Sequence, residues 1–125
     1  MKKALIVDDD TMILRNTSRL LRENGYEVWA VTTGHDAIVE AGKRCFDLLL
    51  LDYILPDIDG LKALKSMGDS VKDAIKIMIT GFPTLEEEIR AFDLGIDTYV
   101  EKPIKSQDLL SLIDQKTKEK KHSTN

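Results

Sequence analysis

The segment Phe46 to Asp52, Phe-Asp-Leu-Leu-Leu-Leu-Asp, decides the fold of this 125-residue chain. Its run from Phe46 to Leu51 is almost continuously apolar, which is typical of a strand buried on both faces. Strands of this kind occur in parallel sheets that helices cover on both sides. The sequence therefore predicts a central strand here, with Asp52 directly after its apolar part.

Four further short apolar runs accompany this strand along the chain. They are Ala4 to Val7, Tyr26 to Val31, Ile75 to Ile79 and Thr98 to Val100. Segments of helical period separate them, and crossovers between parallel strands are right-handed. The alternation predicts an α/β fold, (βα)5: a doubly wound five-stranded parallel sheet with helices on both faces, flavodoxin-like, in strand order 2-1-3-4-5.

The first three helices are predicted from apolar spacing and capping residues. The first has one face made of Ile13, Leu14, Thr17, Leu20 and Leu21. Gly25 provides its stop. A second helix is expected from about Gly34 to Lys43, with Thr33 as its N-cap. A short third helix carries Leu61, Leu64 and Met67.

The fourth helix is predicted from a capping signal and an apolar stripe. Thr84 and Glu87 have the spacing of a capping box. Leu85, Ile89 and Phe92 follow at helical spacing. We expect these three side chains to form the buried face of the helix.

The last helix and the tail are predicted from a change in composition. Ser106 is a candidate N-cap, and Leu109, Leu112 and Ile113 would point inward. The following residues are polar and rich in lysine. We therefore expect one domain over residues 1–115, and a tail over residues 116–125 that frays or begins a linker.

Composition excludes several classes of function. The net charge is -4, from 18 basic and 22 acidic residues, which argues against direct binding of nucleic acid by this chain alone. Cys45 is the only cysteine, so no internal disulfide is expected. No apolar run reaches the roughly 18 residues of a membrane span. Because the apolar stretch after Met1 is too short for a signal peptide, a cytoplasmic location is expected.

Aspartates follow two of the predicted strands. Asp8, Asp9 and Asp10 follow the first strand and Asp52 ends the third. Functional groups of such sheets lie at the carboxyl ends of the strands, so these side chains can meet in one crevice. A purely structural interpretation makes Asp10 a helix N-cap and leaves the others solvated. That explains one aspartate well, whereas a divalent cation would explain the group, and oxygen ligands alone favour Mg²⁺ or Mn²⁺ over zinc.

A threonine and a lysine follow the last two strands. Thr80 offers a hydroxyl donor and Lys102 a positive charge, which together suit a phosphoryl group beside the cation. Taken singly, such a threonine is more often a turn residue beside a glycine such as Gly81, and such a lysine is more often a solvated surface residue. Polar residues suited to a cation and a phosphoryl group follow four of the five predicted strands. This combination favours the functional interpretation.

These four strand ends carry motifs that resemble those of response-regulator receiver domains. The motifs are Leu5-Ile6-Val7-Asp8-Asp9-Asp10, Leu51-Asp52-Tyr53-Ile54-Leu55-Pro56-Asp57-Ile58-Asp59-Gly60, Thr80-Gly81, and Tyr99-Val100-Glu101-Lys102-Pro103. The resemblance covers about Lys3 to Ile113. Each motif alone is weak, but four in this order, each at a predicted strand end, are specific.

The resemblance implies a Mg²⁺-dependent phosphoacceptor site. Asp52 would be the phosphoacceptor, Asp9 a direct Mg²⁺ ligand, Asp8 a ligand through water, and the backbone carbonyl of Ile54 would complete the protein ligands. In the same way, Lys102 would pair with Asp52 before the reaction and with a phosphoryl oxygen afterwards. Thr80 would donate a hydrogen bond to another phosphoryl oxygen. The peptide before Pro103 would be cis and would aim Lys102 into the site.

The resemblance also implies a switch in a two-component phosphorelay. The phosphoryl donor would be a sensor histidine kinase or a phosphotransfer protein. Thr80 would move toward the phosphoryl group, and Tyr99 would turn inward. The face made by the fourth helix, fifth strand and fifth helix would then bind an output domain, a downstream protein or a second copy. The chain would assist its own phosphorylation and dephosphorylation without being an enzyme.

Two alternatives remain at this point. A pseudo-receiver would have the same fold and bind partners without phosphorylation. A metal-dependent phosphohydrolase with an aspartyl phosphate would need a second aspartate two residues after Asp52, where this chain has Ile54. Ile54 and Phe82, each two positions beyond a site residue, also support the hypothesis that apolar groups restrict water access and lengthen the life of an acyl phosphate.

Overall fold

The computed structural model describes residues 1–123 and contains one five-stranded parallel sheet. Its strands are β1 (Lys2–Val7), β2 (Tyr26–Val31), β3 (Leu48–Asp52), β4 (Ile75–Thr80) and β5 (Thr98–Glu101). They lie in the order β2-β1-β3-β4-β5, which confirms the predicted doubly wound fold. All five residues of the central strand β3 are buried, as its continuous apolar sequence predicts.

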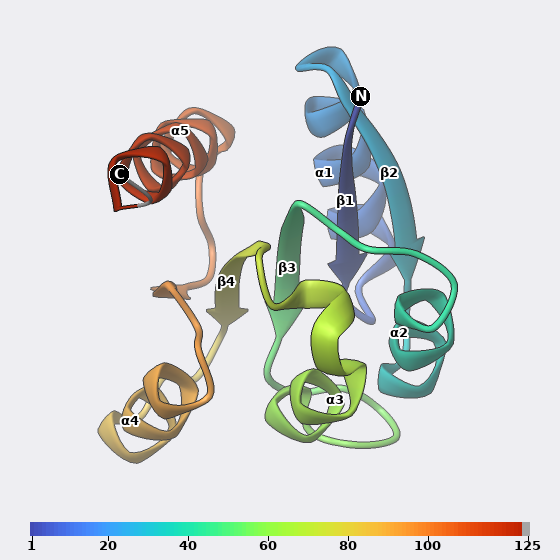
Figure 1. The fold of residues 1–125 in the computed structure, drawn as a ribbon. Coiled ribbons are helices and arrows are strands. Elements are labelled where there is room, and N and C mark those ends of the chain that lie inside the picture. Colours follow the sequence, from blue (N-terminus) through green and yellow to red (C-terminus); the bar gives the residue numbers. More distant parts are fainter. Residues whose placement is uncertain (124–125) are drawn as a thin grey trace.

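Helices cover both faces of the sheet. They are α1 (Thr11–Glu23), α2 (Gly34–Ala41), α3 (Gly60–Met67), the 3₁₀ helix η1 (Gly68–Val71), α4 (Leu85–Asp93) and α5 (Ser106–Ser123). Figure 1 shows α1 and α5 on one face and α2, α3 and α4 on the other. Among the described residues, no helix is both long and apolar enough to span a membrane.

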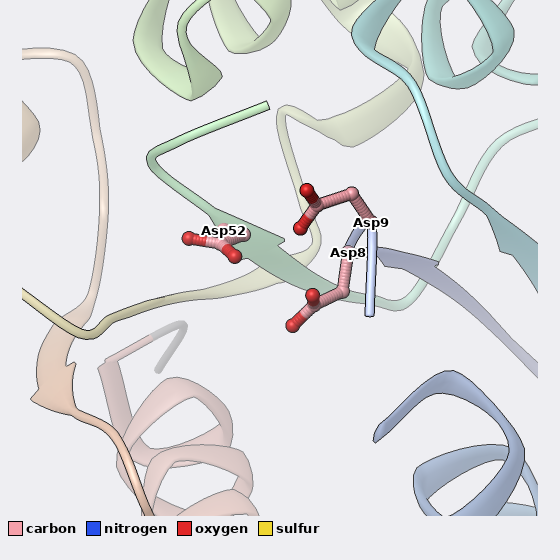
Figure 2. Close-up of side chains that lie close together, drawn as sticks. All are labelled: Asp8, Asp9 and Asp52. Atoms are coloured by element: carbon pink, nitrogen blue, oxygen red, sulfur yellow. The ribbon is translucent and has the colours of Figure 1, made fainter. Parts of the chain in front are cut away.

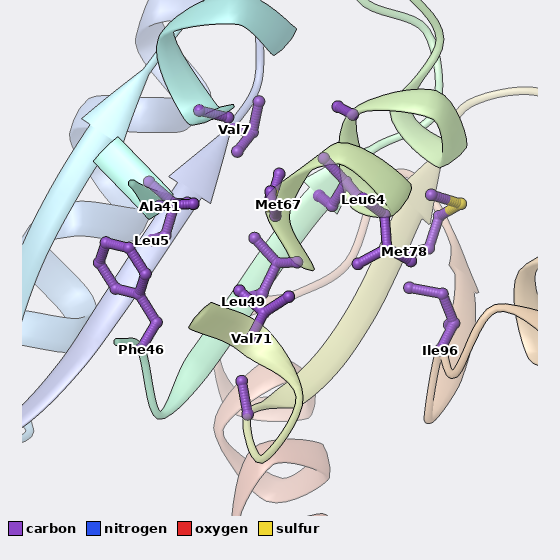
Figure 3. Packing of buried hydrophobic residues seen from close by; sticks show 14 of the residues in the cluster. Leu5, Val7, Ala41, Phe46, Leu49, Leu64, Met67, Val71, Met78 and Ile96 are labelled. Atoms are coloured by element: carbon purple, nitrogen blue, oxygen red, sulfur yellow. The ribbon is translucent and has the colours of Figure 1, made fainter. Parts of the chain in front are cut away.

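Two hydrophobic cores lie on the two faces of the sheet, because successive strand residues point to opposite sides. Leu5, Leu49 and Met78 belong to the cluster beneath α2 and α3, part of which Figure 3 shows. Ile6 and Leu50, each one position further along its strand, belong to the other cluster. That second cluster includes residues of α1 and α5. The sheet therefore fixes both helix layers.

Helix ends are set by the residues that the sequence marks as caps. The Asp10 carboxylate accepts hydrogen bonds from the backbone N–H groups of Met12 and Ile13. The Thr33 side chain accepts one from Asp36 at the start of α2. Gly25, after α1, adopts φ 90°, a left-handed conformation that favours glycine. These contacts confirm the predicted N-caps and the stop of the first helix.

Helix α4 contradicts the prediction of its buried face. Leu85, Ile89 and Phe92 are 73%, 53% and 47% exposed. The helix instead packs through Ala91, which is fully buried. The Thr84 hydroxyl caps the helix by accepting from the Glu87 N–H, as expected.

The polar side of α4 is tied to the domain by two tyrosines. The Tyr99 hydroxyl donates to the Glu87 carboxylate at 3.1 Å, and Arg90 donates to the Tyr53 hydroxyl at 3.5 Å. Glu87 therefore bonds to a side chain of β5. The helical period of the sequence shows that α4 has an apolar face, but it does not show which way this face points. Hydrogen bonds of the polar side of α4 hold that side, and not the apolar face, toward the sheet.

Helix α5 is longer than the sequence suggests. It runs to Ser123, so the expectation that the chain frays from Lys116 is wrong for residues 116–123. Thr117 donates its hydroxyl to the Ile113 carbonyl at 2.7 Å, and Lys120 donates to the Ala74 carbonyl at 2.9 Å. The last two residues of the predicted tail, 124 and 125, lie outside the described residues. The domain boundary at residue 115 remains a prediction.

Candidate functional site

The candidate site lies where β1, β3, β4 and β5 end at one edge of the sheet. Parallel register brings these ends together: Val7 pairs with Leu51, and Asp52 with Ile79. Asp8 follows the last residue of β1, and Asp52 is the last residue of β3. Figure 2 shows Asp8, Asp9 and Asp52 side by side at this edge. The positions of these carboxylates thus follow from the strand order.

Three of the four predicted aspartates form a cluster. One oxygen from each of Asp8, Asp9 and Asp52 lies within 4.8 Å of the others. Asp8 and Asp52 are buried, whereas Asp9 is exposed. The Asp10 N–H donates to Asp8 at 2.9 Å, and the Ile54 N–H donates to Asp52 at 3.2 Å. Asp10 has the capping role that the structural interpretation gave it, so the two interpretations apply to different residues of one motif.

Lys102 joins two of these carboxylates. Its Nζ lies 2.7 Å from Asp52 Oδ2 and 2.8 Å from Asp8 Oδ2. The Lys102 N–H also donates to the Thr80 carbonyl at 2.7 Å, which ties the ends of β5 and β4 together. The peptide between Lys102 and Pro103 is cis, as the resemblance implies. Lys102 is therefore a member of the site and not a solvated surface lysine.

The electrostatics of the site leave an excess of negative charge. Burial raises the pKa of Asp52, and the Asp8 carboxylate adds to this effect, although the bond from Lys102 opposes it. Burial alone would lower the pKa of Lys102, but its bonds to Asp52 and Asp8 outweigh burial and raise it. With the cluster ionised, three carboxylates and one ammonium carry a net charge of −2.

A divalent cation fits this donor set. The cluster offers carboxylate oxygens alone, which hard cations such as Mg²⁺ prefer, and its excess charge matches that of one such ion. The Ile54 backbone lies beside the cluster, since its N–H bonds to Asp52. The family resemblance implied metal ligands among these residues: Asp8, Asp9, Asp52 and the backbone carbonyl of Ile54.

The Thr80 and Tyr99 side chains form hydrogen bonds with partners other than the three carboxylates. Thr80 is fully buried at the end of β4, and its hydroxyl accepts a hydrogen bond from the Phe82 N–H at 3.3 Å. Tyr99 bonds to Glu87 of α4. Burial and the Glu87 carboxylate raise the pKa of Tyr99 to about 12, so its hydroxyl remains a donor at neutral pH.

Two residues of the motif that follows Asp52, Asp57 and Gly60, support the site through contacts with the backbone. Asp57 accepts backbone hydrogen bonds from Gly34 and His35, both at 2.9 Å, and thereby connects the loop after Asp52 to the start of α2. Gly60 does not adopt a positive φ. A Cβ added to Gly60 would lie 2.2 Å from the Asp52 carbonyl oxygen, so glycine is needed for close approach. The turn signal is visible in the sequence, but these contacts are not.

Comparison with curated proteins finds regulatory proteins among the relatives of this chain. The regulatory protein VanRB of Enterococcus faecalis is 34% identical over 112 residues, which cover 90% of this chain and 50% of VanRB. The transcriptional regulatory protein DltR of Streptococcus agalactiae serotype III is 30% identical over 117 residues, 94% of this chain and 52% of DltR. The chain spans about half the length of these relatives.

Solved structures and a family model agree with this result. A CheY-like response regulator receiver domain protein from Methanospirillum hungatei JF-1 has a TM-score of 0.91 and 36% identity, covering 98% of both chains. The BeF3-activated receiver domain of DrrB has a TM-score of 0.80 and 30% identity, covering 92% of this chain and 96% of the other. The model of the response regulator receiver domain matches residues 4–114. With this match, the strand order and the acidic cluster with its lysine, the chain belongs to the response regulator receiver domain family.

Proposed function

We propose that this receiver domain accepts a phosphoryl group on Asp52 from the phosphohistidine of a sensor histidine kinase or phosphotransfer protein. The observation that carries the proposal is the Lys102 ammonium shared by Asp52 and Asp8, beside the exposed carboxylate of Asp9. Phosphoryl transfer requires positioning and neutralisation of oxygen charge more than covalent help. This arrangement supplies both at the end of β3.

In the proposed reaction, an oxygen of the Asp52 carboxylate attacks the phosphorus atom of the donor. The O–P bond to Asp52 forms, the P–N bond to the donor histidine breaks, and the imidazole leaves with the bonding electron pair. Lys102 holds Asp52 before transfer and then pairs with a phosphoryl oxygen. Mg²⁺, held by Asp9, Asp52 and the carbonyl of Ile54, and by Asp8 through water, would neutralise oxygen charge in the transition state.

The proposed signal begins at Thr80. Its hydroxyl oxygen accepts from the Phe82 N–H, and its O–H would donate to a phosphoryl oxygen and so draw in the loop that precedes α4. Tyr99 would then leave its bond to Glu87 and turn inward. The result is a changed surface on α4, β5 and α5 that a partner domain or protein recognises. The domain assists its own phosphorylation and dephosphorylation and acts on no separate substrate.

Partners and location follow from the same proposal. The phosphoryl donor must reach Asp52. An output domain, a downstream protein or a second copy of the chain would bind the switched surface on α4, β5 and α5. Cys45 is exposed and in no disulfide, which supports a reducing compartment, and the cytoplasm is our proposed location.

A phosphoryl mimic tests this proposal against the pseudo-receiver alternative. Beryllofluoride with Mg²⁺ should raise the melting temperature of the wild-type chain, since a ligand of the folded state stabilises it. Asp52→Asn should abolish the rise, whereas Asp69→Asn, at an exposed position of the 3₁₀ helix η1, should leave it unchanged. If the wild-type chain showed no Mg²⁺-dependent rise, the pseudo-receiver interpretation would replace ours.

A further inference from the structure

Helix α4 presents an apolar row to solvent. Leu85, Ile89 and Phe92 are spaced by four and three residues, so they share one face of the helix, and each is about half exposed or more. The opposite side is occupied by buried Ala91 and by Glu87, which is bonded to Tyr99. The row is therefore held outward by contacts on the other side of the helix.

Acidic side chains border this row on both sides. At 100° per residue, Glu86 and Asp93 lie beside the row on one edge and Glu88 lies on the other. None of these three carboxylates forms an ion pair with any residue that the structure describes. Arg90 is the one basic residue of α4, and it faces Tyr53. The outer face of α4 thus has an apolar centre and acidic edges.

We propose that the outer face of α4 binds an amphipathic helix whose apolar row is flanked by lysine or arginine side chains. The inference rests on the proposed function in one respect, since α4 belongs to the surface that phosphorylation would switch. An apolar row of two helical turns fits a helix laid alongside it, and the acidic edges complement basic flanks. The partner is thereby defined by its chemistry.

A second copy of the chain does not offer that chemistry. Pairing α4 with α4 would bring the acidic edges of two copies together. The lysine-rich part of α5, residues 116–121, contains no apolar side chain. On α1, the exposed row of Arg15, Arg19 and Arg22 adjoins a single strongly exposed apolar residue, Met12. A basic amphipathic helix from another protein matches the face better.

Two synthetic helical peptides test the proposal. Both carry the same leucine row over about four turns. One has lysines beside the row and the other has glutamates. Binding to the full chain is followed by fluorescence anisotropy, with and without Mg²⁺ and beryllofluoride. The lysine peptide should bind at least about tenfold more tightly than the glutamate peptide, and added salt should reduce this ratio.

Variants assign the binding to α4. Ile89→Ser should weaken both peptides, whereas Val39→Ser on α2, where the side chain is also 53% exposed, should change neither affinity. The triple substitution Glu86→Lys, Glu88→Lys and Asp93→Lys should reverse the preference between the peptides. Equal affinities, a preference for the glutamate peptide, no binding, or dimers that Ile89→Ser dissociates would each overturn the proposal.

Failure of this inference is distinguishable from failure of the proposed function. The apolar row is exposed without a phosphoryl group, so the charge preference should be measurable in the unloaded chain. A chain that responds to beryllofluoride but does not prefer the lysine peptide refutes the inference alone. A chain that prefers the lysine peptide but does not respond to beryllofluoride refutes the phosphoacceptor proposal alone.

Discussion

The ammonium nitrogen of Lys102 lies 2.7 Å from Asp52 Oδ2, although 50 positions separate the two residues in the chain. The same nitrogen contacts Asp8 at 2.8 Å. One cation therefore serves two buried carboxylates, and its removal would leave both of them without an ion-pair partner among the described residues.

Lys102→Met should destabilise the chain in the absence of divalent cations. The substitution keeps an unbranched side chain but removes the charge, so the free energy of unfolding should fall by about 1–3 kcal/mol. Mg²⁺ should restore part of this loss, because it would neutralise the same carboxylates. Urea unfolding with EDTA and with Mg²⁺ measures both effects. Lys62→Met is the control and should change stability little, because the Lys62 side chain is exposed and lies 4.0 Å from Asp59. An unchanged stability of Lys102→Met would show that the shared ammonium is dispensable.

Gly60→Ala should strain the loop that follows Asp52. The new Cβ would lie 2.2 Å from the Asp52 carbonyl oxygen and 3.0 Å from the Cα of Tyr53, so backbone must shift. We expect a loss of about 2–4 kcal/mol in the free energy of unfolding. Gly81→Ala is a matched control, because its Cβ would have no neighbour within 4 Å and its φ is not positive. Equal losses for the two variants would refute the close-approach explanation.

Asp57→Asn should lower the melting temperature at neutral pH. Partial desolvation would raise the pKa of Asp57, but hydrogen bonds from the backbone N–H groups of His35, Gly34 and Ile58 hold it well below its ordinary value. A lowered pKa of a carboxyl gives stability that is present above the unfolded pKa of about 4 and lost as the pH falls through the folded pKa. The difference between wild type and variant should therefore shrink below about pH 4. Melting curves across pH, with Asp69→Asn as control, test this, and a constant difference would contradict it.

Ile54→Asn should shorten the life of a phosphorylated chain. Ile54 and Phe82 are 52% and 76% exposed, and the backbone N–H of each bonds to a site side chain, of Asp52 and Thr80 respectively. Their apolar side chains would limit the approach of water to an acyl phosphate. A polar group at position 54 should raise the dephosphorylation rate by about tenfold, or about 1.4 kcal/mol in the barrier. The decay of the phosphorylated mass with time gives the rate. A rate equal to that of wild type would end the hypothesis.

The sequence allows the sheet to be predicted because each strand carries its own local signal. The continuous run of β3 and the β-branched and aromatic residues of β2 depend on no distant partner. The site then follows, since parallel strands bring their carboxyl ends to one edge. The positions of Asp8 and Asp52 were predicted for this reason. The pairing of Lys102 with Asp52 was implied only by the family resemblance, and the contact of Lys102 with Asp8 was not predicted.

What could not be predicted depends on contacts between distant residues. Periodicity identified the apolar row of α4. The tyrosines that hold its polar side inward lie outside this helix, Tyr99 on β5 and Tyr53 in the loop after β3. Asp57 lies more than twenty positions from the two residues, Gly34 and His35, whose backbone N–H groups donate to it. The extension of α5 is supported by a Lys120 bond to the Ala74 carbonyl, which no local pattern reveals.

Intact mass after incubation with Mg²⁺ and acetyl phosphate tests the central claim, phosphorylation of Asp52, most directly. Wild type should gain the mass of one phosphoryl group, and EDTA should prevent the gain. Asp52→Asn should remain unmodified under the same conditions, whereas Asp69→Asn should behave as wild type. A phosphoryl group that still appears on Asp52→Asn, or a wild-type chain that gains none, would contradict the account.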